Sequence, residues 1–163
     1  MVNIGVLVSG GGTNLQAIID AIEAKRLKAS IKLVVSDNAQ AFALKRAERH
    51  GMKTAVVTKE GFPSREPFDG ELVRVLKENG VQLVVLAGFM RILSPLFIRA
   101  FPLRIMNIHP ALLPSFPGLN VQKKAVEYGV KFSGCTVHFV DEGLDTGPII
   151  IQAVIPVLED DTP

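Results

Sequence analysis

The chain has 163 residues and a single cysteine, so it suits one domain with a sizeable core, and a disulfide within the chain is excluded. Apolar residues make up 48% of the composition, which is typical of a globular protein, and no apolar run is long enough to span a membrane. The net charge of +2 is far from the strongly basic balance of a nucleic-acid-binding protein.

Short apolar runs alternate with amphipathic stretches along the first two thirds of the chain. The nearly continuous apolar runs predict buried strands at 2–8, 31–35, 54–57, 81–87 and 104–108. Helical periodicity predicts helices around 15–22, 41–50 and 65–79, and the glycines at positions 51 and 80 end the last two. After Pro110 the pattern predicts a helix at 120–128 and strands at 136–140 and 149–157 that are joined by a tight loop.

This order of elements predicts an α/β fold. Strands that alternate with helices form a mostly parallel open sheet with right-handed crossovers and helices on both faces. The tight loop near the end of the chain predicts a C-terminal strand region that is partly antiparallel. No repeat or linker divides the chain, so a single domain is expected over residues 1–163.

A glycine-rich turn is expected where the first strand meets the first helix, in the run Ser9-Gly10-Gly11-Gly12-Thr13-Asn14. Successive glycines leave the backbone open to a ligand, and the helix N-terminus that follows favours phosphate. A P-loop would need Lys where Thr13 stands, and the third glycine of a dinucleotide fingerprint would fall at Leu15. The turn therefore predicts a site for a single phosphate; the alternative is a tight connection without a ligand.

Polar side chains end the fifth predicted strand, at the edge where ligands bind in open α/β sheets. The alternation of a strand places Asn107 and His109 on one side and Ile108 on the other. These two residues suit acyl transfer, because an amide can donate to an oxyanion and an imidazole can donate or relay a proton. The alternative is that both side chains only cap the end of the strand.

The loop at 141–148 presents Asp145 between two glycines, where it can hold a water molecule or orient and charge an imidazole. A solvated turn aspartate is the alternative, and His138, inside a strand, has the alternative of a packed core histidine. Since no Ser or Cys lies in a nucleophile elbow, the pattern favours direct attack of one substrate on another. Cys135 and His138 lack a second pair of ligands, so no metal site is expected.

The chain resembles the phosphoribosylglycinamide formyltransferases, a branch of the folate-dependent formyltransferase family, over essentially its whole length. The matching segments are SGGGTNLQ at 9–16, SR at 64–65, GFMRILS at 88–94, NIHPALLP at 107–114, FPG at 116–118, GCTVHFV at 134–140 and DTGP at 145–148. The segment that contains Asn107 and His109, together with Asp145, marks the wider family, and the glycine-rich turn selects the phosphoribosyl substrate within it.

The resemblance implies a Rossmann-like formyltransferase fold and transfer of the formyl group of 10-formyltetrahydrofolate to the amine of 5-phosphoribosylglycinamide, in purine biosynthesis. It implies that Asn107, His109 and Asp145 are catalytic and that His138 supports them. The residues implied to bind the phosphoribosyl substrate are Gly11, Gly12, Thr13 and Asn14. Those implied to bind folate are Arg65, Met90, Arg91, Ile92, Leu93, Asn107, Asp141 and Asp145. Residues 1 to about 100 are then the phosphate-binding half, and residues from about 101 to 163 the folate-binding and catalytic half.

Folate is expected as a co-substrate, with no metal, nucleic acid or membrane as partner, in a cytoplasmic enzyme. The alternatives are a formyltransferase that acts on methionyl-tRNA, a folate hydrolase and a non-catalytic phosphosugar-binding module. Each of the first two would carry a further domain, which is not expected within 163 residues. Members of the family continue past the position of Pro163, so a C-terminal helix is expected to be missing from this chain.

Overall fold

A computed structural model describes residues 1–163, which divide into two compact units, Met1–Ile105 and Met106–Pro163. The sheet of the first unit contains β1 (Val2–Val8), β2 (Ala29–Ser36), β3 (Thr54–Val56) and β4 (Leu83–Leu86). Their spatial order is β3-β2-β1-β4, and each neighbouring pair is parallel. The predicted parallel α/β arrangement is therefore confirmed, and the strand bounds lie within two residues of those expected.

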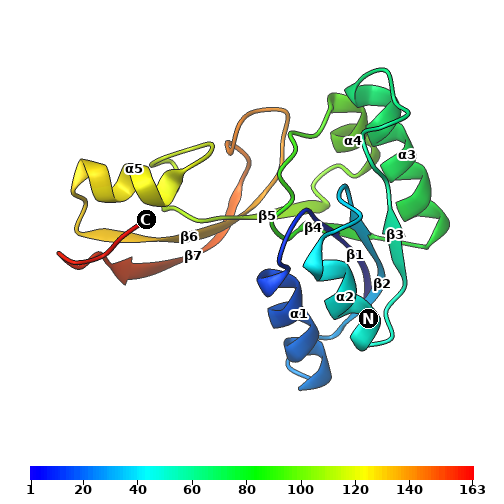
Figure 1. Cartoon of the computed structure of the whole chain (residues 1–163), viewed down its shortest axis with the longest axis horizontal. Helices are drawn as coiled ribbons and strands as arrows, with labels where there is room; N and C mark the ends of the chain where they lie inside the picture. Colours follow the sequence, from blue (N-terminus) through cyan, green and yellow to red (C-terminus); the bar gives the residue numbers. More distant parts are fainter. The chain divides into compact units, whose positions relative to one another are not determined.

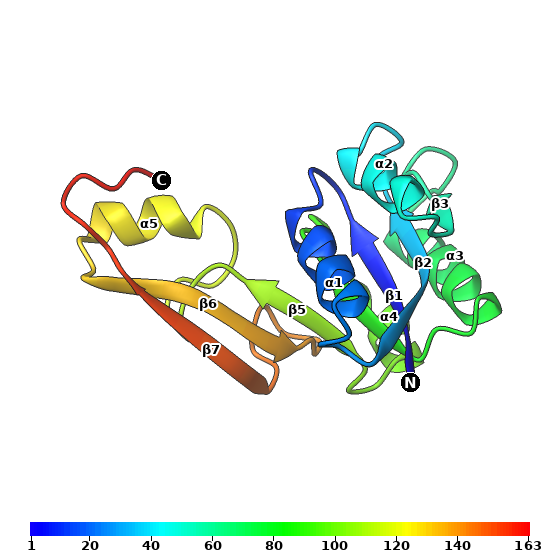
Figure 2. The same cartoon turned by 90° about the horizontal axis from the view of Figure 1, so that it is seen from below.

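The helices of the first unit pack in two pairs. Helix α1 (Thr13–Glu23) lies beside α2 (Phe42–Arg49), and α3 (Arg65–Glu78) lies beside α4 (Pro95–Ala100) (Figure 1). The chain steps outward from β1 to β3 and then returns to β4 on the other side of β1, so the second pair covers the opposite face (Figure 2). This reversal beside β1 is where open α/β sheets bind ligands.

The core of the first unit follows from the apolar runs of its central strands. Side chains of β1, β2 and α1 are fully buried, including Val6, Leu7, Val8, Leu33, Val34, Leu15 and Ile19. Helix α4 is short, and its bounds were not predicted, although the order of elements required a helix there. It begins at Pro95, which has the preset φ that suits a first helical position.

The second unit contains α5 (Val121–Tyr128) and the antiparallel order β5-β6-β7, with β5 (Ile105–His109), β6 (Phe132–Phe139) and β7 (Ile149–Pro156). The partly antiparallel C-terminal region is thus confirmed. Strand β6 begins four residues before the expected position 136. Gly134 lies in this extension, where a side chain would collide with the carbonyl oxygen of Ala153. All eight residues of β7 are exposed.

No helix of the structure is both long enough and apolar enough to cross a membrane.

Candidate functional site

The glycine-rich turn connects β1 to α1 in the first unit. Gly12 has a left-handed backbone, with φ of +73°, and is the N-cap of α1. A Cβ at Gly12 would lie 2.6 Å from the Cβ of Ala43, so the approach of α2 requires glycine here. At Gly10 and Gly11 a side chain would meet open space. Gly12 therefore has a packing role, whereas its two predecessors leave the turn open to a ligand.

A hollow of about 230 Å³ opens on this turn. It brings together the four residues expected to bind the phosphoribosyl group, Gly11, Gly12, Thr13 and Asn14. Thr13 and Asn14 begin α1 and do not cap it, since no side-chain hydrogen bond closes the helix start. The first N–H groups of a helix have no partner within the helix, and they lie at its positive dipole end. The hollow therefore suits a small anion.

A larger cleft of about 430 Å³ lies in the same unit, and its lining includes the start of α3. Of the residues expected to bind folate, it gathers Arg65, Met90, Arg91 and Ile92. Leu93 is buried and does not line the cleft. One further cation, Lys59, and two phenylalanine rings, Phe62 and Phe68, lie outside the expected set and also line it. Apolar rings and cations around one cleft suit a ligand that carries both an aromatic system and a carboxylate.

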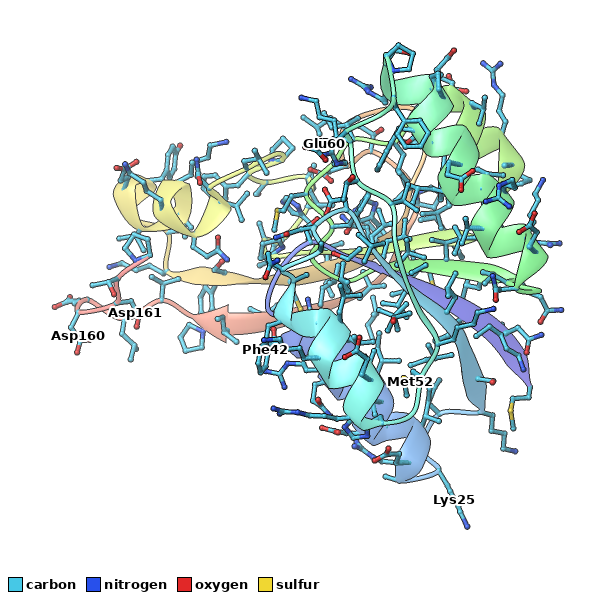
Figure 3. The ribbon with its side chains drawn as sticks, turned by 45° about the vertical axis from the view of Figure 1, so that its right-hand side comes forward. Lys25, Phe42, Met52, Glu60, Asp160 and Asp161 are labelled. Carbon is cyan, nitrogen blue, oxygen red and sulfur yellow. The ribbon has the colours of Figure 1, made fainter.

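Glu60 lies on the loop between β3 and α3, next to the cleft-lining Lys59 (Figure 3). A hydrogen bond from its own backbone N–H lowers the pKa of the Glu60 carboxyl, and a hydrogen bond from Thr58 lowers it further. The Glu60 carboxyl therefore stays ionised to a lower pH than an ordinary glutamate.

Two carboxylates, one part-buried and one buried, hold the segment at 88–94. Nε of Arg91 donates to Oδ2 of Asp37 at 2.6 Å, while its guanidinium lies 4.9 Å from the centre of the Phe68 ring. Asp69, only 1% exposed, accepts a hydrogen bond of 2.6 Å from the N–H of Ser94. Sequence reasoning missed both carboxylates. The place of Asp37 directly after β2 is a signal that could have found it, whereas Asp69 lies inside α3 without any motif.

In the second unit, His109 ends β5 and is buried. Its Nε2 lies 2.8 Å from the carbonyl oxygen of Phe116. A carbonyl only accepts, so we assign a proton to Nε2. Its Nδ1 faces Oδ2 of Asp145 at 3.5 Å. When both ring nitrogens are protonated, His109 can donate toward both oxygens and place its positive charge beside the carboxylate.

His138 is the partner that orients Asn107. The two residues are opposite each other in the β5–β6 register, and His138 is 1% exposed. Its Nδ1 lies 2.9 Å from the carbonyl oxygen of Phe139, so the proton belongs on Nδ1 and Nε2 is free to accept. Nδ2 of Asn107 lies 3.2 Å from that Nε2. One N–H of the amide is thus used by His138, and the second N–H remains available to a ligand.

Asp145 lies on the loop between β6 and β7, with φ of +54°. Its Oδ2 accepts a hydrogen bond of 2.8 Å from the N–H of Gly118, and its Oδ1 lies 3.8 Å from Nε2 of His138. Its side chain is 12% exposed, so it is not a solvated turn residue. Asp145, His109, His138 and Asn107 therefore form one cluster within the second unit, which we call the imidazole–carboxylate cluster.

Asp141 has a different place in the same loop. Its Oδ1 accepts from the N–H of Gly143 at 3.0 Å and from Oγ1 of Thr146 at 2.8 Å, so it shapes the loop that carries Asp145. No group of three or more His, Cys, Asp or Glu side chains in the structure is arranged to hold a metal ion.

Comparison with known proteins identifies the class. The family model described as formyl transferase matches residues 2–163, so the chain belongs to the formyl transferase family.

Among its members, the chain is similar to phosphoribosylglycinamide formyltransferases. It is 47% identical over 160 residues to that enzyme of Escherichia coli (strain K12), covering 98% of this chain and 76% of the enzyme. Glycinamide ribonucleotide transformylase 1 from Symbiobacterium toebii superposes with a TM-score of 0.98 at 52% identity, covering 99% of this chain and 76% of that one. The resemblance stated from the motifs is confirmed.

A longer relative contains a similar segment. The trifunctional purine biosynthetic protein adenosine-3 of Drosophila melanogaster is 52% identical over 160 residues, which cover 97% of this chain. The chain spans 12% of that protein's length.

Proposed function

We propose that this chain transfers the formyl group of 10-formyltetrahydrofolate to the amine of 5-phosphoribosylglycinamide, a step of purine biosynthesis. The observation that carries the proposal is the imidazole–carboxylate cluster: Asn107, His109, His138 and Asp145 meet with no Ser or Cys nucleophile among them. A set of donors, a proton carrier and a carboxylate without a nucleophile suits direct transfer between two bound substrates.

In the proposed reaction the amine attacks the formyl carbon on N10 of the folate. A C–N bond forms, the π bond of the formyl C=O opens, and the formyl carbon becomes tetrahedral and bears an oxyanion. The free N–H of Asn107 donates to that oxyanion, and protonated His109 stabilises its charge. Asp145 stabilises the positive charge of His109 from 3.5 Å away or holds a water molecule that moves one proton from the attacking amine to N10. The oxyanion then re-forms the C=O bond as the bond from carbon to the protonated N10 breaks, and the folate leaves.

The first unit supplies the binding groups in this proposal. The turn at Gly11–Asn14 holds the phosphate through backbone N–H groups, with Thr13 beside them. The cleft lined by Arg65 and Met90–Ile92 takes the folate, whose ring system suits the apolar walls and whose carboxylate suits the cations. Binding both substrates in defined orientations lowers the entropic cost of their reaction. Neither a metal nor nucleotide energy is required, because the formyl group is already activated.

Formyl transfer with three competing acceptors tests the proposal. The purified chain receives 10-formyltetrahydrofolate with glycinamide ribonucleotide, with water alone, and with methionyl-tRNA. We expect the formyl group on the ribonucleotide, and Asn107→Ala should lower that turnover by about 10²–10³-fold, as expected when one oxyanion donor is lost. Hydrolysis alone would favour a folate hydrolase, and transfer to tRNA would favour the other formyltransferase. Binding of ribonucleotide without any transfer would favour a non-catalytic phosphosugar-binding module.

A further inference from the structure

Helix α2 holds the glycine-rich turn through two consecutive carbonyl groups. The N–H of Ala43 donates to the carbonyl oxygen of Gly10 at 3.0 Å, and Nε of Arg46 donates to that of Gly11 at 2.9 Å. Phe42 is the first residue of α2 (Figure 3). Arg46 follows it in the sequence by one helical turn. Both carbonyls are therefore turned toward α2.

The direction of these carbonyls sets the direction of the amides that follow them. A trans peptide is planar, and its C=O and N–H point in opposite directions. The N–H groups of Gly11 and Gly12 must then point away from α2. Neither of them donates a hydrogen bond to another group of residues 1–105. Two successive free N–H groups make a concave donor site of the kind that binds anions.

Arg46 is itself held on two further sides. Its guanidinium lies 5.0 Å from the centre of the Phe42 ring, and its Nη1 lies 3.3 Å from Oε1 of Gln16. The amide of Gln16 is oriented in turn, because its Nε2 donates to Oδ1 of Asp20 at 2.8 Å and leaves the oxygen for Arg46. No carboxylate of residues 1–105 forms an ion pair with Arg46. Its positive charge is thus not neutralised by a direct ion pair next to the turn.

We propose that Arg46 is the positioning residue of the phosphate site. It pins the Gly11 carbonyl to α2, so that the amides of Gly11 and Gly12 face a phosphate monoester before the ligand arrives. Its free charge adds electrostatic attraction for the same dianion. This inference rests on the proposed function, because it deepens the role given there to the turn. A pair of N–H donors that is already oriented loses less conformational entropy on binding. Loss of Arg46 therefore weakens phosphate binding, although every contact between the turn and the ligand can still form.

The test compares Arg46 with a neighbour that carries the same charge. Arg49 lies on the same helix, with its guanidinium 5.8 Å from the Phe42 ring, and it makes no hydrogen bond to the turn. Calorimetry measures the Kd of glycinamide ribonucleotide, inorganic phosphate and folate for the parent, Arg46→Ala, Arg46→Lys and Arg49→Ala. We expect Arg46→Ala to raise the Kd for both phosphate compounds by about 10- to 100-fold, the usual cost of a hydrogen bond to a charged group. The Kd of Arg46→Lys for these compounds should lie between those of the parent and Arg46→Ala, and the Kd of Arg49→Ala should equal that of the parent. Folate binding should not change in any of the variants.

An amide NMR titration with inorganic phosphate gives a second readout. In the parent, phosphate should shift the N–H resonances of Gly11 and Gly12, and in Arg46→Ala these shifts should shrink. Equal weakening by Arg46→Ala and Arg49→Ala would overturn the inference in favour of general charge attraction. Parent-like binding by Arg46→Lys would also overturn it, because charge alone would then suffice. Joint weakening of folate and phosphate with a lower melting temperature would show a folding role instead. If the parent binds neither phosphate compound, the proposed function itself fails.

Discussion

Replacement of Asp145 by Asn removes one charge from the imidazole–carboxylate cluster and keeps an oxygen that can accept the N–H of Gly118. The carboxylate lies 3.5 Å from Nδ1 of His109, and a unit charge pair at that distance interacts by about 5 kcal/mol at an effective dielectric constant of about 20. Only the share expressed in the transition state affects the rate, and a hydrogen bond to a charged group is worth about 1.5–3 kcal/mol. We therefore expect kcat to fall by about 10- to 200-fold, because about 1.4 kcal/mol corresponds to one factor of ten.

The assay is formyl transfer at saturating ribonucleotide and folate, with thermal melting and the Kd of the ribonucleotide measured on the same samples. Melting should change little, since the hydrogen bond to Gly118 is retained. Glu127→Gln is the matched control: it removes a carboxylate of the same unit that is 63% exposed and 3.7 Å from Lys123. Control and parent should have equal kcat. A folded Asp145→Asn variant with unchanged kcat would refute the electrostatic role given to this carboxylate.

Three further predictions concern separate parts of the chain. His109→Ala should lower kcat by about 10²–10³-fold with little change in the Kd of the ribonucleotide. Near-normal turnover would refute the catalytic role proposed for His109. Gly12→Ala should lower the melting temperature, because Gly12 has a positive φ and helix α2 packs closely against it. Gly11→Ala should keep the parent's melting temperature and its affinity for folate, but bind the ribonucleotide more weakly. Equal melting temperatures of the two variants would contradict this. The pKa of Glu71 is lowered by a hydrogen bond from Arg74, so its stabilisation is present above the ordinary glutamate pKa and lost as pH falls through the lowered value. Glu71→Gln should therefore melt below the parent at neutral pH and alongside it in acid, and a gap that persists in acid would argue against this ion pair as the cause.

Local patterns in the sequence predict most of the helices and strands. The apolar run at 2–8 becomes β1 without a change of bounds, because a strand buried on both faces needs apolar residues at every position. The helix stops also follow from single residues, since Gly51 and Gly80 adopt the positive φ that glycine tolerates. The extent of β6 was not predictable in this way, because its first residues pair with β7 and take their conformation from that partner.

The residues to which the proposed chemistry is assigned were visible in the amino-acid sequence: the glycine-rich turn, the polar end of β5 and the loop with Asp145. These are contiguous motifs, whose residue types and spacing are visible along the chain.

The contacts that hold those residues in place depend on the folded backbone. The β5–β6 register turns His138 into the acceptor that orients Asn107, and the backbone of Phe116 selects the protonated nitrogen of His109. Arg46 donates a hydrogen bond to Gly11, which lies 35 residues earlier in the chain, and Arg91 donates to Asp37, which lies 54 residues earlier. Such contacts depend on the path of the backbone between the two residues, and a hydrogen bond forms only when that path brings donor and acceptor within about 3 Å, which no local pattern of residue types encodes.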